Sequence, residues 1–152
     1  MKQKHFLTIK SADIISQAEA RTFKFGKARD TGGNDKLVNN VKLTDLEYER
    51  DMAYMWIDEA VENIMSEFKR YSSGVTKYGD GELKSYIMKF ELSSKWPKEN
   101  ADGFDIDCKE YIINMVVHEF LSLSLPKEAD VFASKAMQYF KNAERKLYYK
   151  TA

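Results

Sequence analysis

The clearest structural signal in this chain is YIINMVVHEFLSLSLPKEADVFASKAMQYFKNAERKLYY, residues 111–149. Two apolar segments with helical spacing meet there at Leu125-Pro126. Proline is well tolerated in the first turn of a helix, because its fixed φ suits the helix and its missing N–H would have no partner there. The stretch therefore predicts two long helices, at about 105–123 and 126–149, folded back on each other with almost no loop.

Two further helices are expected earlier in the chain. Thr44, followed three residues later by Glu47, forms the capping pattern that opens a helix, and apolar residues then recur at steps of three and four. Ser11 can cap a first helix that runs to about Ala28. Its apolar stripe is thin and its basic residues are many, so we expect it to pack weakly or to need a partner. The paired glycines and asparagines of 30–43 predict a flexible loop.

One short segment has the period of a strand. In SYIMKFELS, residues 85–93, buried-type residues alternate with their neighbours, which is typical of a strand. Residues 74–78 are the expected antiparallel partner, joined to it through the Gly-Asp-Gly turn at 79–81. Residues 98–105 are polar and predict a loop.

Together these elements predict a mainly α fold: a single-domain bundle of about four helices with one small β-hairpin, at about residues 74–93. The domain is expected to span 1–152. Its core is expected in 44–150, while 1–43 supplies a basic helix and a loop whose folding can depend on a partner. A chain of 152 residues with 43% hydrophobic and 13% aromatic residues is large and apolar enough for one such core.

Composition excludes several classes of protein. The 24 basic and 24 acidic residues leave no net charge, so no overall field attracts nucleic acid or a membrane. The lone Cys108 rules out an internal disulfide and suits a reducing compartment. No segment has the length of a signal peptide or a membrane span. We therefore expect a cytoplasmic protein that makes no membrane contact.

The charges are nevertheless unevenly distributed. Residues 1–29 and 134–152 are basic, whereas residues 45–67 carry eight acidic residues against Arg50. Opposite charges on separate elements favour head-to-tail association of copies, although the same charges can equally pair within one molecule. The candidate interaction surface drawn from these segments comprises Arg21, Lys24, Lys27, Arg29, Glu47, Asp51, Asp58, Glu62, Lys141, Arg145 and Lys146.

No catalytic residue, metal site or cofactor is predicted. His118-Glu119 begins the zinc-protease pattern, but Ser122 stands where the second histidine is needed. The acidic residues within 102–107 lack the spacing of a calcium loop, and acidic residues at a helix start stabilise its dipole without a ligand. No glutamate is followed by the histidine that di-iron bundles require. Cys108 has no strongly activating neighbour in the sequence.

Three motifs carry a resemblance to a known group: MKFELSSKWP at 88–97, CKEYIINMVVHEF at 108–120 and LPKEA at 125–129. Over about residues 44–150 the chain resembles small, mostly uncharacterised prophage-encoded proteins found among virion structural genes, of the head–tail connector kind. A comparable tryptophan, a "YI" helix and an "LP-x-EA" junction recur in that group. The resemblance implies a role in virion assembly that involves no chemistry.

We therefore expect a non-enzymatic structural or assembly protein that acts through protein–protein contacts, including contacts with copies of itself, in the cytoplasm or in an assembled virion. Nucleic acid is not an expected partner. The alternative is a small nucleic-acid-binding or regulatory helical protein that uses the basic N- and C-terminal segments. A third hypothesis, an enzyme, would need a deep pocket in which acidic residues and His118 converge.

Overall fold

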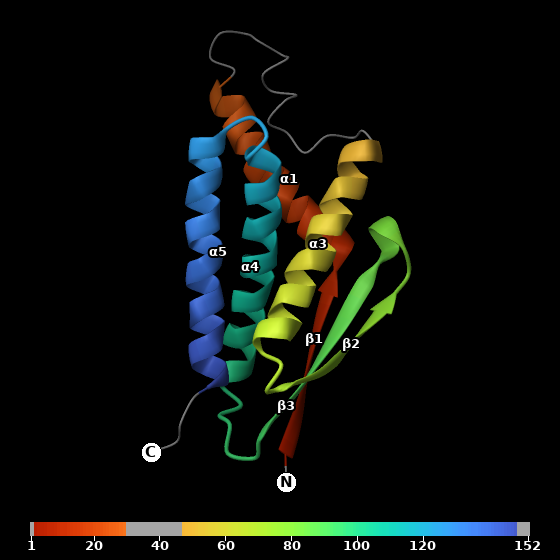
Figure 1. Cartoon of the computed structure of the whole chain (residues 1–152), viewed down its shortest axis with the longest axis vertical. Coiled ribbons are helices and arrows are strands. Elements are labelled where there is room, and N and C mark those ends of the chain that lie inside the picture. The colour runs from red at the N-terminus through yellow and green to blue at the C-terminus, as the bar shows by residue number, and fades with distance from the viewer. Residues whose placement is uncertain (1, 30–46, 149–152) are drawn as a thin grey trace.

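The computed structural model describes residues 2–29 and 47–148, and within them the side chains of 2–22 and 50–148 (Figure 1). The loop expected at 30–43 and the cap expected at Thr44 lie outside the described residues. In chain order the elements are β1 Lys2–Lys10, α1 Ser11–Arg29, α3 Glu47–Glu67, β2 Ser72–Tyr78, a 3₁₀ turn Gly81–Leu83, β3 Ser85–Ser93, α4 Asn100–Leu121 and α5 Pro126–Leu147.

The strands of the described residues form one antiparallel sheet in the order β1-β3-β2. The hairpin of β2 and β3 is confirmed, and so is the alternation within β3, whose even-numbered residues 86–92 are buried. Gly79 and Gly81 have φ of 68° and 55° in the connecting turn, a conformation that glycine adopts without steric cost. On its other side β3 pairs with β1, with Lys2 opposite Ser93.

This pairing makes the fold α+β, so the prediction of a helical bundle with one hairpin is wrong. Residues 2–10 form a nine-residue strand that the prediction lacked. Leu7 and Ile9 are buried while Thr8 and Lys10 are exposed, which is the alternation of a half-buried strand. The exposed Phe6 obscures that period, and the partner strand follows only after α1 and α3.

The two long helices predicted around Pro126 are confirmed as α4 and α5. The N–H of Leu125 donates to the carbonyl of Leu121 at 2.6 Å, and the N–H of Ala129 donates to the carbonyl of Leu125 at 2.9 Å, so the chain reverses within one turn. The loop predicted at 98–105 is shorter than expected. α4 already begins at Asn100, because its first turns carry the fully buried Phe104 into the core.

A chain of aromatic rings joins the sheet to the helices. Phe104 of α4 packs edge-on against Phe90 of β3, with ring centroids 5.1 Å apart, and lies 6.2 Å from Phe68 at the end of α3. Phe68 in turn stacks on Phe140 of α5 at 4.9 Å. Aromatic pairs of this kind add to the large apolar area that each ring buries. The helices are thereby held on one side of the sheet (Figure 1).

The helix α1 packs within the chain, despite its thin apolar stripe. Ile14, Ile15 and Ala18 are buried, and the backbone N–H of Ser11 donates to the carbonyl of Lys84 at 2.9 Å. Residues 2–22 therefore contribute to the same core as 50–148, although the core was expected in 44–150 alone.

Replacing Leu7 by alanine tests whether β1 is part of this core. Leu7 is almost completely buried, so Leu7→Ala is expected to lower the free energy of unfolding by about 2–5 kcal/mol, measured by urea denaturation. The neighbouring Phe6→Ala is the matched control and should cost at most about 1 kcal/mol, because Phe6 points away from the core. Equal losses in the two variants would contradict the observed register.

Candidate functional site

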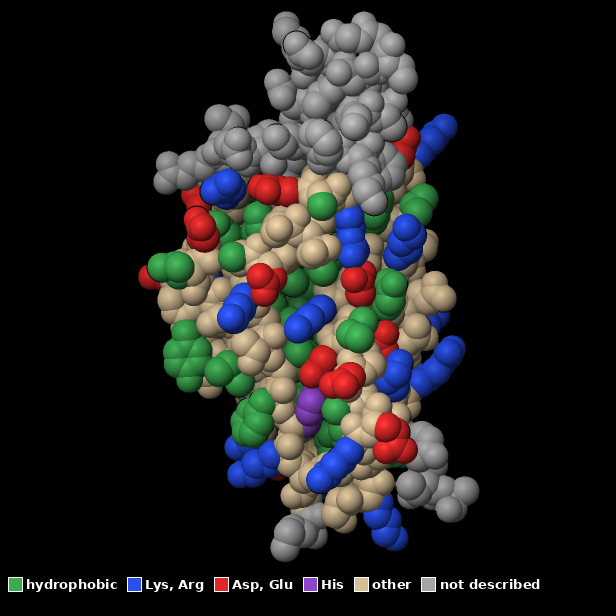
Figure 2. Space-filling view, turned by 180° about the vertical axis from the view of Figure 1, so that it is seen from behind, with side chains coloured by type: hydrophobic (Ala, Val, Ile, Leu, Met, Phe, Trp, Pro, Cys, Tyr) green, Lys and Arg blue, Asp and Glu red, His purple; other side chains and the backbone are tan. Residues whose placement is uncertain are grey.

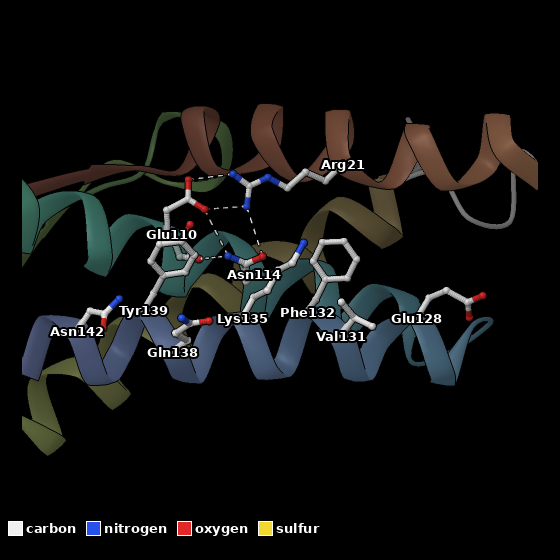
Figure 3. A pocket seen from close by; sticks show the side chains of 10 residues that line it. All are labelled: Arg21, Glu110, Asn114, Glu128, Val131, Phe132, Lys135, Gln138, Tyr139 and Asn142. Carbon is white, nitrogen blue, oxygen red and sulfur yellow. Dashed lines mark hydrogen bonds and ion pairs between the residues drawn. The ribbon is translucent and has the colours of Figure 1, made fainter.

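A groove of about 820 Å³ lies between α1 and α5, with α4 as its floor (Figure 3). α1 contributes Arg21, and α4 contributes Glu110 and Asn114. The α5 residues face the groove because they recur at steps of three and four, which places them on one side of a helix. They are Glu128, Val131, Phe132, Lys135, Gln138, Tyr139 and Asn142.

The polar groups at the centre of the groove bind one another. The Arg21 guanidinium donates to both carboxylate oxygens of Glu110 at 2.9 Å, a bidentate geometry that gives strong, directional hydrogen bonds. Asn114 is 1% exposed, and its amide N–H donates to the Glu110 carbonyl at 2.7 Å. Arg21 also donates to the Asn114 side-chain oxygen at 3.4 Å. This network fastens α1 to α4, and it leaves these three side chains engaged with each other.

A second polar cluster joins α3 to β3. The Asp58 carboxylate accepts a hydrogen bond from the Tyr86 hydroxyl, and the Lys84 ammonium lies 3.0 Å away. Burial would raise the pKa of Asp58, but the hydrogen bonds from Tyr86 and Lys84 and the nearby positive charges outweigh it and lower this pKa. Burial, together with the Asp58 carboxylate, raises the pKa of Tyr86. The phenol therefore stays protonated as a hydrogen-bond donor.

Two further polar contacts also connect elements. Asp107 of α4 is buried and lies 2.5 Å from the Lys146 ammonium of α5. Nε2 of His5 on β1 lies 2.6 Å from Asp105 of α4. Cys108 is buried next to these residues, and burial raises its thiol pKa well above the usual value, which keeps it in the unreactive thiol form.

The candidate surface residues therefore divide into three groups. Some are engaged within the chain: Arg21, Asp58, Glu62, which lies 3.0 Å from Lys77, and Lys146. Others are exposed on α3 and α5: Asp51, Lys141 and Arg145. The side chains of the third group lie outside the described residues: Lys24, Lys27, Arg29 and Glu47.

Two methionines missing from the predicted surface are exposed among its charges. Met55 on α3 is 60% exposed, and Met137 on α5 is 48% exposed. The signal in the sequence is an apolar residue in the middle of a charged helix face. We call Asp51, Met55, Glu59 and Glu62 the acidic α3 face, and Ser134, Met137, Lys141 and Arg145 the basic α5 face. The residues of the basic α5 face border a shallow hollow of about 490 Å³.

Comparison of the chain with protein-family models, curated proteins and solved structures finds no match. Within residues 2–29 and 47–148, no three His, Cys, Asp or Glu side chains are grouped as a metal site requires. No helix in that part of the chain is long and apolar enough to cross a membrane. The function is therefore inferred from the geometry of the molecular surface.

Because the pKa of Asp58 is lowered in the folded protein, its carboxylate contributes free energy of unfolding that is lost in acid. The stabilisation from its carboxylate is complete above the ordinary pKa of 3.8 and is lost as pH falls through the lower folded value. Between about pH 5 and about pH 2, the wild type should therefore lose more free energy of unfolding than Asp58→Asn. Urea denaturation at each pH measures this. Asp51→Asn, on the exposed side of the same helix, is the control, and it should follow the wild type.

Proposed function

We propose that this protein is a non-enzymatic structural or assembly protein that acts through protein–protein contacts and associates head to tail with copies of itself. The observation that carries the proposal is the presence of two oppositely charged faces, each with an exposed methionine, on two helices that lie on opposite sides of α4 (Figure 1). The virion-assembly role implied by the resemblance to prophage-encoded proteins is part of the proposal.

The acidic α3 face has the form of a protruding ridge. Asp51, Met55 and Glu59 are each four residues apart, so their side chains form one row along the helix. All are exposed, and Glu62 continues the row toward the end of the helix. A ridge that presents an apolar side chain between carboxylates suits a partner surface with an apolar hollow rimmed by cations.

The basic α5 face supplies two such cations beside one exposed apolar side chain. Met137 lies in the shallow hollow, with Lys141 and Arg145 beyond it at the following turns of the helix. Exposed cations opposite exposed carboxylates steer association and fix its orientation, while burial of the two methionines contributes apolar area. The groove is not part of the proposed contact, because its central charges bind each other in the Arg21–Glu110 pair.

The arrangement favours an open or ring-shaped assembly. A contact between two different faces of the same molecule is heterologous, so a bound pair of copies still has one free face of each kind, on different copies. Copies then add in sequence until the rotation between neighbours closes a ring, or they continue as a filament. Either outcome suits a component of a larger particle.

Light scattering during size-exclusion chromatography tests the association at about 0.01 M and about 1 M salt, where the screening length is about 30 Å and about 3 Å. The wild type should form oligomers at low salt that dissociate at high salt. The double variant Lys141→Glu/Arg145→Glu should be monomeric, and so should Asp51→Lys/Glu59→Lys, because each places like charges on both faces.

An equimolar mixture of these two double variants should associate again, since every contact between unlike copies then joins opposite charges. The control Lys95→Glu/Lys98→Glu changes the same number of exposed basic residues in the connection between β3 and α4, and it should behave as the wild type. A wild type that stays monomeric at low salt and high concentration would disprove head-to-tail association.

A further inference from the structure

The outer face of the sheet points away from the helices, and its residues follow from the register. Phe6 of β1 lies opposite Lys89 of β3, which in turn lies opposite Gly74 of β2. The next row along the sheet is Thr8, Ile87 and Thr76, and cross-strand neighbours share one face of a sheet. We call this surface the outer sheet face; its other members are Lys2, Lys4, Lys10, Tyr78, Ser85, Glu91 and Ser93.

Two aromatic rings are exposed on the outer sheet face. Phe6 is 54% exposed and Tyr78 is 53% exposed, although both belong to regular strands. Strand geometry places them roughly 13 Å apart along the sheet and roughly 10 Å apart across it, with Ile87 between them. They are therefore far enough apart to contact two different groups of one extended ligand.

The charge of this face is strongly biased, unlike that of the whole chain. Four lysines (Lys2, Lys4, Lys10 and Lys89) stand against one carboxylate, Glu91. The threonine hydroxyls of the middle row lie beside the rings and can donate or accept hydrogen bonds. Figure 2 shows hydrophobic side chains gathered on the side of the molecule where the sheet lies, with basic side chains below them and both basic and acidic side chains above them.

We propose that the outer sheet face binds single-stranded nucleic acid. Exposed rings on an open antiparallel sheet provide stacking platforms for unpaired bases, and flanking lysines contact the phosphates. A protein partner fits less well, because the cores of protein interfaces are depleted in lysine. A duplex fits less well too, because its bases are stacked on each other and their flat faces are not available to Phe6 and Tyr78.

This site is separate from the faces proposed for self-association. The basic α5 face belongs to a helix that lies on the far side of α4 from the sheet (Figure 1). The inference therefore goes beyond the assembly function, since a particle component with such a surface would carry nucleic acid along its length. Loss of one activity need not remove the other.

Fluorescence anisotropy with labelled oligothymidylate and oligouridylate at low salt tests the proposal. The protein should bind at least one of these two oligonucleotides more tightly than it binds a duplex of equal length. The ratio of the two dissociation constants shows whether the protein prefers DNA or RNA. Phe6→Ala and Tyr78→Ala should each weaken binding about tenfold, the usual effect of removing one stacking ring. Lys4→Glu and Lys89→Glu should weaken binding and flatten its salt dependence.

The matched control is Lys141→Glu/Arg145→Glu, which removes two basic residues from α5 and should bind oligonucleotides that span a single outer sheet face like the wild type. The same variant is expected to abolish self-association. Self-association and oligonucleotide binding are therefore tested by different substitutions, and failure of one proposal can be told from failure of the other. Circular dichroism melts confirm that the Phe6 and Tyr78 variants remain folded. No binding at low salt, equal binding to the duplex or to heparin, or binding unchanged in both aromatic variants would each overturn the proposal.

Discussion

The packing of Phe104 between Phe90 and Phe68 is the contact on which the architecture depends, since it joins the sheet, the end of α3 and α4 at one buried point. Phe68 extends the connection to α5 through Phe140. Interiors are packed as densely as organic crystals, so this ring cluster fixes where the outer surfaces of the same elements point. It sets α3 and α5 on opposite sides of α4 and turns one sheet face to the surface. Both proposed interaction surfaces follow from that placement.

Local signals in the sequence predicted the elements whose contacts are local. The junction at Leu125-Pro126, the hairpin and the helix after Ser11 were all correctly placed, because a cap, a turn or a helical period lies within a few residues. β1 was missed because the strand that pairs with it, β3, lies far away in the sequence. Its exposed Phe6 breaks the apparent alternation, and the hydrogen bonds that make Lys2–Lys10 a strand come from β3. A single strand has no local partner to reveal it.

A similar limit applies to the charged residues of the candidate surface. The runs of acidic and basic residues correctly indicated charged helices, but the sequence does not show which charges find partners within the fold. Arg21 pairs with Glu110, and Lys146 pairs with Asp107, across large separations in the chain. The lysines of β1 were assigned to a basic N-terminal segment. Their gathering beside Lys89 on one face became visible only once the strand register was known.

The pairing of β1 with β3 also constrains how the protein is made. A ribosome adds about 5–20 residues per second, so β1 leaves it several seconds before β3 is complete. During that interval Leu7 and Ile9 have no complete helical layer to cover them, and the backbone of residues 2–10 has no strand to bond with. The alternating lysines of β1 are then useful in another way, because charge on an unpaired strand opposes its aggregation with other nascent chains.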